Sequence, residues 1–386
     1  MFRKPVGGGI ALLFVLSIAS HIFAQTPAQK TPAGKPAGSL PGTFTYIPKA
    51  DVEKVQNAIQ NGIPNDSPVR MVSVGGKYNL GVYTLNYSEP SKPRPAGAPV
   101  NGWYHRDIAE LYYFASGAGT WRVGGELENP VEDDVNGRSV KEVRGPGVVG
   151  VLKGYTDQKF SAGDILIVPP GVPHSPGAMT EPTRIIRVVI DPHMVMPLFP
   201  AATRTSASSQ AKPQTTAAAK AAPKLPGTFT FIPKADIDRV LKEEETPGPS
   251  GDRPVRTIDL ANMNWRLGVY VLHTPELPKA PRGPATSGWY HTHIAELYYF
   301  MQGAGTFMIG GSLENPTEDA PDSWSTKMVR GPSVSGKFKG ATDLKFEAGD
   351  LLIAPTGVPH TPSEVTAVPR DILRIAIDPD KVLPLK

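Results

Sequence analysis

The stretch GWYHTHIAELYYFMQGAGT (residues 288–306) decides the fold, because nearly the same stretch, GWYHRDIAELYYFASGAGT, occupies residues 102–120. A second segment recurs with it, since GDILIVPPGVPH from Gly163 matches GDLLIAPTGVPH from Gly349. A fixed internal period indicates a duplicated unit, and copies of about 160 residues have the length of a complete domain. The chain of 386 residues is therefore predicted to hold two similar domains in tandem.

A third repeat marks where each domain begins, LPGTFTYIPKAD from Leu40 and LPGTFTFIPKAD from Leu225. Between the two copies, the chain is rich in Ala, Thr, Ser, Lys and Pro and lacks apolar periodicity, which is typical of a flexible linker. We therefore expect the first domain over residues 40–199, the linker over 200–224 and the second domain over 225–386.

The N-terminus has the pattern of a secretory signal. Two basic residues precede an apolar segment over residues 9–20, and Ala24 offers a cleavage point. A dozen apolar residues are fewer than the ~20 that a membrane-spanning helix needs. We expect a signal peptide over residues 1–24, a tether over 25–39, a secreted or periplasmic mature protein and no stable membrane insertion after cleavage.

The formal charge of +4, from 40 basic and 36 acidic residues, comes from the predicted tails. Residues 1–39 and 200–224 together hold eight Lys or Arg and no acidic residue, so the rest of the chain has 32 basic residues against 36 acidic ones. This distribution argues against a nucleic-acid partner. The chain has no cysteine, which excludes disulfides and thiolate metal sites and leaves His, Asp and Glu side chains as metal ligands.

Each copy has the pattern of an all-β domain, with short apolar runs broken by Gly and Pro. Each begins with a predicted helix directly after Pro48 or Pro233, where Pro favours a helix start. Strands without alternating helices favour a sandwich or barrel over a βαβ fold. The predicted strands are LGVYTL from Leu80, LGVYVL from Leu267, ELYYF from Glu110 and from Glu296, DILIV from Asp164 and IIRVVI from Ile185.

Five of the eight histidines lie inside the repeated segments. In the second copy, His291 and His293 are separated by one residue in a predicted strand, so both side chains are expected on one face. Glu296 begins the next strand, and His360 follows a strand that ends in Pro and Gly. Three imidazoles and one carboxylate inside a barrel suit a divalent metal with positions left for water or substrate. Each residue taken alone is more often an ordinary polar residue, and the combination indicates the metal site.

The first copy has His105, Asp107, Glu110 and His174 at the corresponding positions. Asp107 replaces a histidine, so the copy offers two carboxylates and two imidazoles. This set favours a second site of harder character, suited to Mn or Fe. The alternative is a decayed site retained for packing.

These motifs resemble those of the cupin superfamily, in its two-domain bicupin arrangement. Glu296 is followed by six residues and Gly303, and Gly349 is followed by Pro355 and His360 at the spacing of the second cupin motif. The gap of two residues before Glu296 is shorter than the family's usual three or four. The resemblance implies two double-stranded β-helix (jelly-roll) barrels, with an architecture like that of germins and oxalate decarboxylases.

Other repeated side chains allow two interpretations. Arg144 and Arg330 either clamp an anionic substrate or form ordinary surface ion pairs. Trp103 and Trp289, expected on the histidine-bearing face, either plug the barrels or line pockets. The acidic segments LENPVED and LENPTED are expected as surface loops.

Two functional classes compete at this point. The leading hypothesis is an exported metal-dependent enzyme, with dioxygenase or decarboxylase chemistry on a small molecule at Mn or Fe, although Zn, Ni or Cu would also suit the ligands. The alternative is a non-catalytic ligand-binding or storage-like bicupin with structural metals. The sequence assigns no general acid or base, and a homo-oligomer is possible.

Overall fold

The computed structural model describes residues 43–62, 65–95, 97–199, 228–244, 251–260, 262–278 and 283–386. The predicted signal peptide, the tether and the 200–224 linker lie outside these ranges. No helix within the described ranges is both long enough and apolar enough to span a bilayer.

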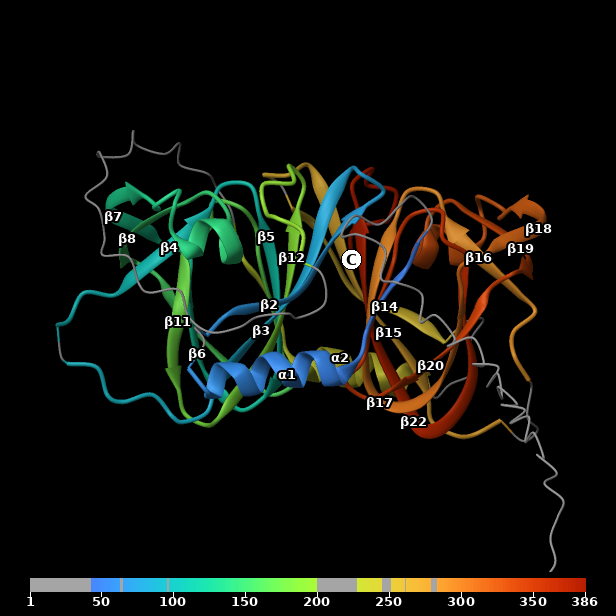
Figure 1. Cartoon of the computed structure of the whole chain (residues 1–386), viewed down its shortest axis with the longest axis horizontal. Helices are drawn as coiled ribbons and strands as arrows, with labels where there is room; N and C mark the ends of the chain where they lie inside the picture. The colour runs from blue at the N-terminus through green and yellow to red at the C-terminus, as the bar shows by residue number, and fades with distance from the viewer. Residues whose placement is uncertain are drawn as a thin grey trace, which may run out of the picture. The chain divides into compact units, whose positions relative to one another are not determined.

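The first repeat is built from two antiparallel sheets (Figure 1). One has the order β10-β5-β12-β3-β2 and the other the order β7-β8-β4-β11-β6-β9. From β3 to β6 the chain changes sheet at every strand, and β9 to β12 change sheet in the same way, which is jelly-roll topology. The strands are β2 (Ser67–Val74), β3 (Tyr78–Tyr87), β4 (Asn101–His105), β5 (Ala109–Ser116), β6 (Ala118–Val123), β7 (Glu126–Glu132), β8 (Gly147–Lys153), β9 (Thr156–Ser161), β10 (Ile165–Val168), β11 (His174–Met179) and β12 (Thr183–Asp191).

The second repeat has the same topology with two strand pairs fused. β17 (Ala295–Ile309) covers the positions of β5 and β6, and β22 (His360–Asp378) covers those of β11 and β12. The prediction of an all-β chain with two jelly-roll barrels is confirmed. The remaining strands are β14 (Asp252–Leu260), β15 (Trp265–Thr274), β16 (Ser287–His291), β18 (Ser312–Glu318), β19 (Ser333–Lys339), β20 (Thr342–Glu347) and β21 (Leu351–Ala354).

The helices begin where the prolines predict. α1 (Lys49–Gln60) starts directly after Pro48, and α2 (Lys234–Glu244) directly after Pro233. Two short π-helical turns, η1 (Ser139–Arg144) and η2 (Thr326–Arg330), precede β8 and β19. The prediction of surface loops at the two LENP segments is wrong, because these segments form the edge strands β7 and β18.

The two repeats exchange their first strands. β1 (Thr45–Ile47) pairs with β21 of the second repeat, and β13 (Thr230–Ile232) pairs with β10 of the first. The start of α1 is held in the same way, because the Asp350 carboxylate accepts hydrogen bonds from the Lys49 backbone N–H at 2.7 Å and from the Tyr46 hydroxyl at 2.5 Å. The sequence did not predict this exchange.

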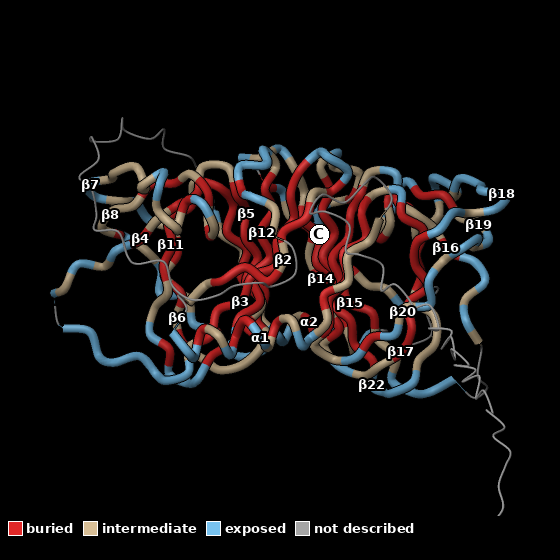
Figure 2. Tube along the Cα trace, viewed as in Figure 1, coloured by how far each residue is buried: buried red, intermediate tan, exposed pale blue. Residues whose placement is uncertain are grey.

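Aromatic side chains fill each barrel next to its repeated histidines. Phe114 stacks on Phe160 with ring centroids 3.8 Å apart, and Phe300 stacks on Phe346 at 3.9 Å. Figure 2 shows buried residues along the central strands of both repeats and exposed ones at the edge strand β18. These apolar interiors exclude water from one side of the polar groups described below.

Replacing Asp350 with alanine tests the strand exchange. Asp350→Ala removes the acceptor for the first N–H of α1 and for Tyr46, so the unfolding free energy should fall by about 2 kcal/mol. Urea unfolding followed by circular dichroism measures this change. Asp343→Ala, in the exposed part of β20, is the matched control and should unfold like the parent protein. Equal stability of the two variants would contradict a stabilising exchange.

Candidate metal centres

Each barrel brings two histidines and one glutamate together in its interior. In the first repeat, His105 ends β4, Glu110 lies in β5 and His174 begins β11. Both imidazole Nε2 atoms lie near Glu110 Oε2, that of His105 at 3.1 Å and that of His174 at 3.0 Å. All three residues are at most 2% exposed. We call this group the first triad.

The second triad repeats this arrangement with His291, Glu296 and His360. His291 Nε2 lies 3.1 Å from Glu296 Oε1, and His360 Nε2 lies 2.9 Å from Glu296 Oε2. None of the three is more than 2% exposed. In both triads, one potential ligand atom from each residue lies within 4.8 Å of the others.

The structure differs from the sequence prediction at Asp107 and His293, which stay outside the triads. Asp107 is one-third exposed and faces His193, and His293 is 41% exposed and bonds Asp380 at 2.8 Å. The physical reason is that β4 ends at His105 and β16 ends at His291, two residues before Asp107 and His293. The next residues form a bend, so the strand alternation that would place i and i+2 on one face no longer applies.

Hydrogen bonds on the far side of the rings orient the histidines. His174 Nδ1 donates to the Val172 carbonyl at 2.9 Å, and His360 Nδ1 donates to the Val358 carbonyl at 2.8 Å. A carbonyl oxygen only accepts, so each Nδ1 bears a hydrogen, and the neutral form of each ring then has its lone pair on Nε2. Metal-ligating histidines typically donate the hydrogen of their other ring nitrogen to a carbonyl or carboxylate in this way.

The remaining histidine of each triad is held differently in the two repeats. His291 Nδ1 lies 2.9 Å from Ser333 Oγ, and that hydroxyl donates its own hydrogen to the Gly331 carbonyl at 3.0 Å. Ser333 therefore accepts from His291. In the first repeat the register partner of His105 is Gly147, and among the described residues His105 Nδ1 has no hydrogen-bond partner. The second triad is thus the better oriented.

The sequence missed a buried arginine beside each glutamate. Arg187, 1% exposed, donates to Glu110 Oε1 at 2.5 Å and pairs with Asp66 at 3.0 Å. Arg374 bonds Glu296 in the same way and pairs with Asp252 at 3.0 Å. The available signal was an arginine in the middle of an apolar strand, in IIRVVI and ILRIAI, because a buried Arg is expected only where it is paired.

A tyrosine hydroxyl donates to each glutamate as well, from Tyr112 to Glu110 at 2.7 Å and from Tyr298 to Glu296. These tyrosines lie two residues after the glutamates, on the same face of the strand. Burial and the adjacent carboxylate raise the pKa of both hydroxyls well above their ordinary value. Both tyrosines therefore stay protonated and help to fix the carboxylates.

The protonation states suit metal binding. Burial lowers the pKa of His105 to about 4, despite the opposing effect of Glu110, and also lowers the pKa of His291. Burial alone would raise the pKa of Glu110 and Glu296, but the histidines and the buried arginines hold both well below the usual range. At neutral pH each triad therefore offers an ionised carboxylate and at least one neutral imidazole, that of His105 or His291.

These donors fit a divalent metal ion. The buried Nε2 atoms of His105, His291 and His360 have no hydrogen-bond partner among the described residues, although each is aimed at a carboxylate. Nitrogen lone pairs that accept no hydrogen bond and lie around one centre can instead bind a cation. Two imidazoles and one carboxylate also form the facial set that leaves coordination positions open.

The second triad opens into a cavity of about 310 Å³. Arg330 and Trp289 line it, with the guanidinium 3.5 Å from the indole centroid. Arg330 thus faces the triad cavity, and Trp289 forms a wall of it. Arg370 and His273 line the same cavity, and Asp371 lies 2.5 Å from His273 Nδ1.

The comparisons with known proteins found structural similarity and no match by sequence. No family model matches the chain, and no curated protein matches its sequence. Salicylate 1,2-dioxygenase from Pseudaminobacter salicylatoxidans is 14% identical, with 87% of this chain and 84% of that chain covered at a TM-score of 0.44. A deletion mutant of Bacillus subtilis oxalate decarboxylase is 12% identical, with 90% and 79% covered at a TM-score of 0.39.

The class of the protein follows from its own strand topology and triads. The chain forms two jelly-roll barrels, each with a buried His/Glu group, and this is the arrangement that the resemblance of its motifs to those of bicupins implies. The chain therefore has two jelly-roll barrels and two candidate sites for a divalent metal.

Substitution of single histidines tests the composition of the second triad. His291→Ala should lower the metal content by about one equivalent per chain, because it removes a converging Nε2 atom. His293→Ala is the matched control and should leave the content unchanged, because this imidazole points to Asp380. Elemental analysis of the purified variants measures both. An equal loss in the two variants would return His293 to the ligand set.

Ser333 provides a test of histidine orientation. Ser333→Gly introduces the residue found in the first repeat and removes the acceptor for His291 Nδ1. The metal affinity of the second triad should fall roughly 10- to 100-fold, the usual effect of removing a residue that hydrogen-bonds a metal ligand. Competition with a fluorescent chelator measures the affinity, with Ser312→Gly in the exposed part of β18 as control. An unchanged affinity would show that the serine does not orient the ligand.

Proposed function

We propose that the protein is exported and acts as a metal-dependent enzyme on a small molecule, with the second triad as its reaction centre. The observation that supports this most strongly is the cavity of about 310 Å³ beside His291 and Glu296. A buried ligand set next to a space of small-molecule size is the usual arrangement of an active site.

The ligand set favours Fe(II) or Mn(II), although Zn, Ni or Cu would also accept these donors. Two histidines and one carboxylate with open positions are typical of non-haem iron oxygenases. A bound ion of this kind would supply Lewis acidity or electron transfer to a coordinated substrate. Dioxygenase or decarboxylase-type chemistry fits this description.

The cavity supplies the groups that such a reaction needs from the protein. Arg330 and Arg370 place positive charge on the cavity wall and favour an anionic substrate. The Asp371 carboxylate lies 2.5 Å from His273 Nδ1 and occupies that nitrogen. Nε2 is therefore the ring atom that would give a proton to a substrate or take one from it. His273 is therefore the proposed acid/base, and the first repeat has Asn86 at the corresponding position.

Turnover by the reconstituted protein tests the proposed function. The protein, loaded separately with Fe(II), Mn(II) and Zn(II), is screened with small organic acids and phenols for oxygen uptake and carbon dioxide release. We expect turnover with Fe or Mn and its abolition in His360→Ala. His273→Ala should keep its metal and lose roughly 100- to 10,000-fold in kcat. Metal binding without turnover on any substrate would favour the non-catalytic bicupin.

A further inference from the structure

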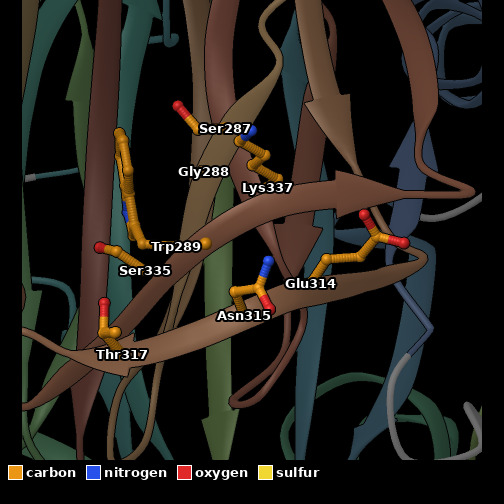
Figure 3. A pocket seen from close by; sticks show the side chains of 9 residues that line it. Ser287, Gly288, Trp289, Glu314, Asn315, Thr317, Ser335 and Lys337 are labelled. Carbon is orange, nitrogen blue, oxygen red and sulfur yellow. The ribbon is translucent and has the colours of Figure 1, made fainter.

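A second cavity, of about 370 Å³, lies beside the second triad on the sheet formed by β16, β19 and β18 (Figure 3). Alternate residues of β16 share a face, so Ser287 and Trp289 point to the same side as His291. Their cross-strand partners in β19 are Lys337 and Ser335. The cavity therefore continues the surface that bears the metal-ligating histidine. We call it the β18 groove.

Trp289 connects the β18 groove to the triad. Its indole lines both cavities, and it lies edge-on to His360 with ring centroids 6.1 Å apart. The guanidinium of Arg330, 3.5 Å from the indole centroid, holds the ring in place. A ligand in contact with Trp289 is thus adjacent to the metal centre.

Polar side chains surround the indole in the β18 groove. Figure 3 shows Ser335 and Thr317 next to Trp289, with Lys337 and Asn315 across the cavity. The Ser335 hydroxyl donates to Asp319 at 2.5 Å, so its oxygen can still accept a hydrogen bond from a ligand. The groove therefore combines one flat apolar surface with several hydrogen-bonding groups at different heights.

The first repeat provides an internal comparison, because the same register positions there are apolar. Trp103 is paired with Val149, and Val149 with Val131. Val151 takes the place of Lys337 and is paired with Asn101. The two repeats share the triad and the tryptophan, but three neighbouring positions are polar only in the second. Since the fold accepts valine at all three, the polar residues are not required by the fold.

We propose that the β18 groove binds a saccharide, with one pyranose ring stacked on Trp289. A pyranose has an apolar C–H face that suits an aromatic ring and hydroxyl groups at its rim that both donate and accept hydrogen bonds. Hydroxyl, amide and ammonium groups around a single indole match this distribution. An apolar ligand would displace water from these polar groups without replacing the hydrogen bonds.

The charges in the β18 groove favour an acidic sugar over a neutral one. Glu314 is paired with Lys339 at 3.4 Å and Arg330 with Asp319 at 3.9 Å, whereas Lys337 forms no ion pair with any described residue. A carboxylate on the bound ring would be attracted by Lys337. The proposal rests on the proposed function only in that the reacting end of the saccharide would reach the second triad.

Binding of defined trisaccharides to the full-length protein tests the proposal. Cellotriose, tri-N-acetylchitotriose and trigalacturonate are titrated by isothermal calorimetry, with tryptophan fluorescence as a second signal. We expect saturable binding of one stoichiometric equivalent, with trigalacturonate tightest. Trp289→Ala should weaken it at least tenfold, whereas Trp103→Ala, the matched position in the first repeat, should not.

A second variant keeps the test independent of a folding defect. Thr317→Val, Ser335→Val and Lys337→Val together install the residues of the first repeat, which the same fold already accommodates. This triple variant should keep its circular dichroism spectrum and its metal content and lose at least tenfold in affinity. Unaltered affinity, or the absence of Trp289-dependent binding by every trisaccharide, would overturn the proposal.

The His360→Ala variant separates the two proposals. If the saccharide still binds this variant, the β18 groove is a binding site whatever the fate of the metal. Saccharide binding by a parent protein that shows no metal-dependent turnover, or turnover unchanged in His360→Ala, would contradict the proposed function alone. Retained metal-dependent turnover of small acids without saccharide binding would contradict this inference alone.

Discussion

The pairing of a buried arginine with a buried glutamate is the interaction on which both sites depend. A carboxylate that is at most 1% exposed would be neutral in an apolar barrel unless a charge compensated it. Arg187 and Arg374 supply that charge, and each is itself compensated by a second carboxylate, Asp66 or Asp252. Because the pairs are buried, removal of one partner leaves an unpaired charge, so these residues are coupled to the stability of the barrels.

The same pairs connect distant parts of the fold to the triads. Arg187 also donates to the Val143 carbonyl at the end of η1, and Arg374 donates to the Val329 carbonyl at the end of η2. Each arginine lies over a tyrosine ring as well, at 4.4 Å for Tyr83 in the first repeat. One side chain thus fixes the carboxylate, the turn that leads into the outer sheet and the neighbouring strand. The conformation of each glutamate is set by side chains from four strands, which for Glu110 are β4, β5, β11 and β12.

The two repeats show which parts of this design vary. The triads, the arginines and the tyrosines are present twice, whereas the surroundings of the second triad are more polar. Ser333 faces His291 where the first repeat has Gly147, and a side chain at Gly147 would lie 2.6 Å from the Tyr104 carbonyl. The acid/base candidate His273 and the polar β18 groove also belong to the second repeat. The two copies therefore keep one ligand set and differ in what they present to a ligand.

The sequence by itself determined the duplication, the all-β class, the helix starts and the identity of the residues that form the triads, because these depend on local pattern and on repeated motifs. It also placed Asp107 and His293 among the metal ligands, and leaving them out would have required knowing that the strands end at His105 and His291. It did not show the arginine partners or the strand exchange, since these join residues that lie dozens to hundreds of positions apart. Only the tertiary structure decided which lone pairs converge, because burial and hydrogen bonds from distant segments fix each side chain.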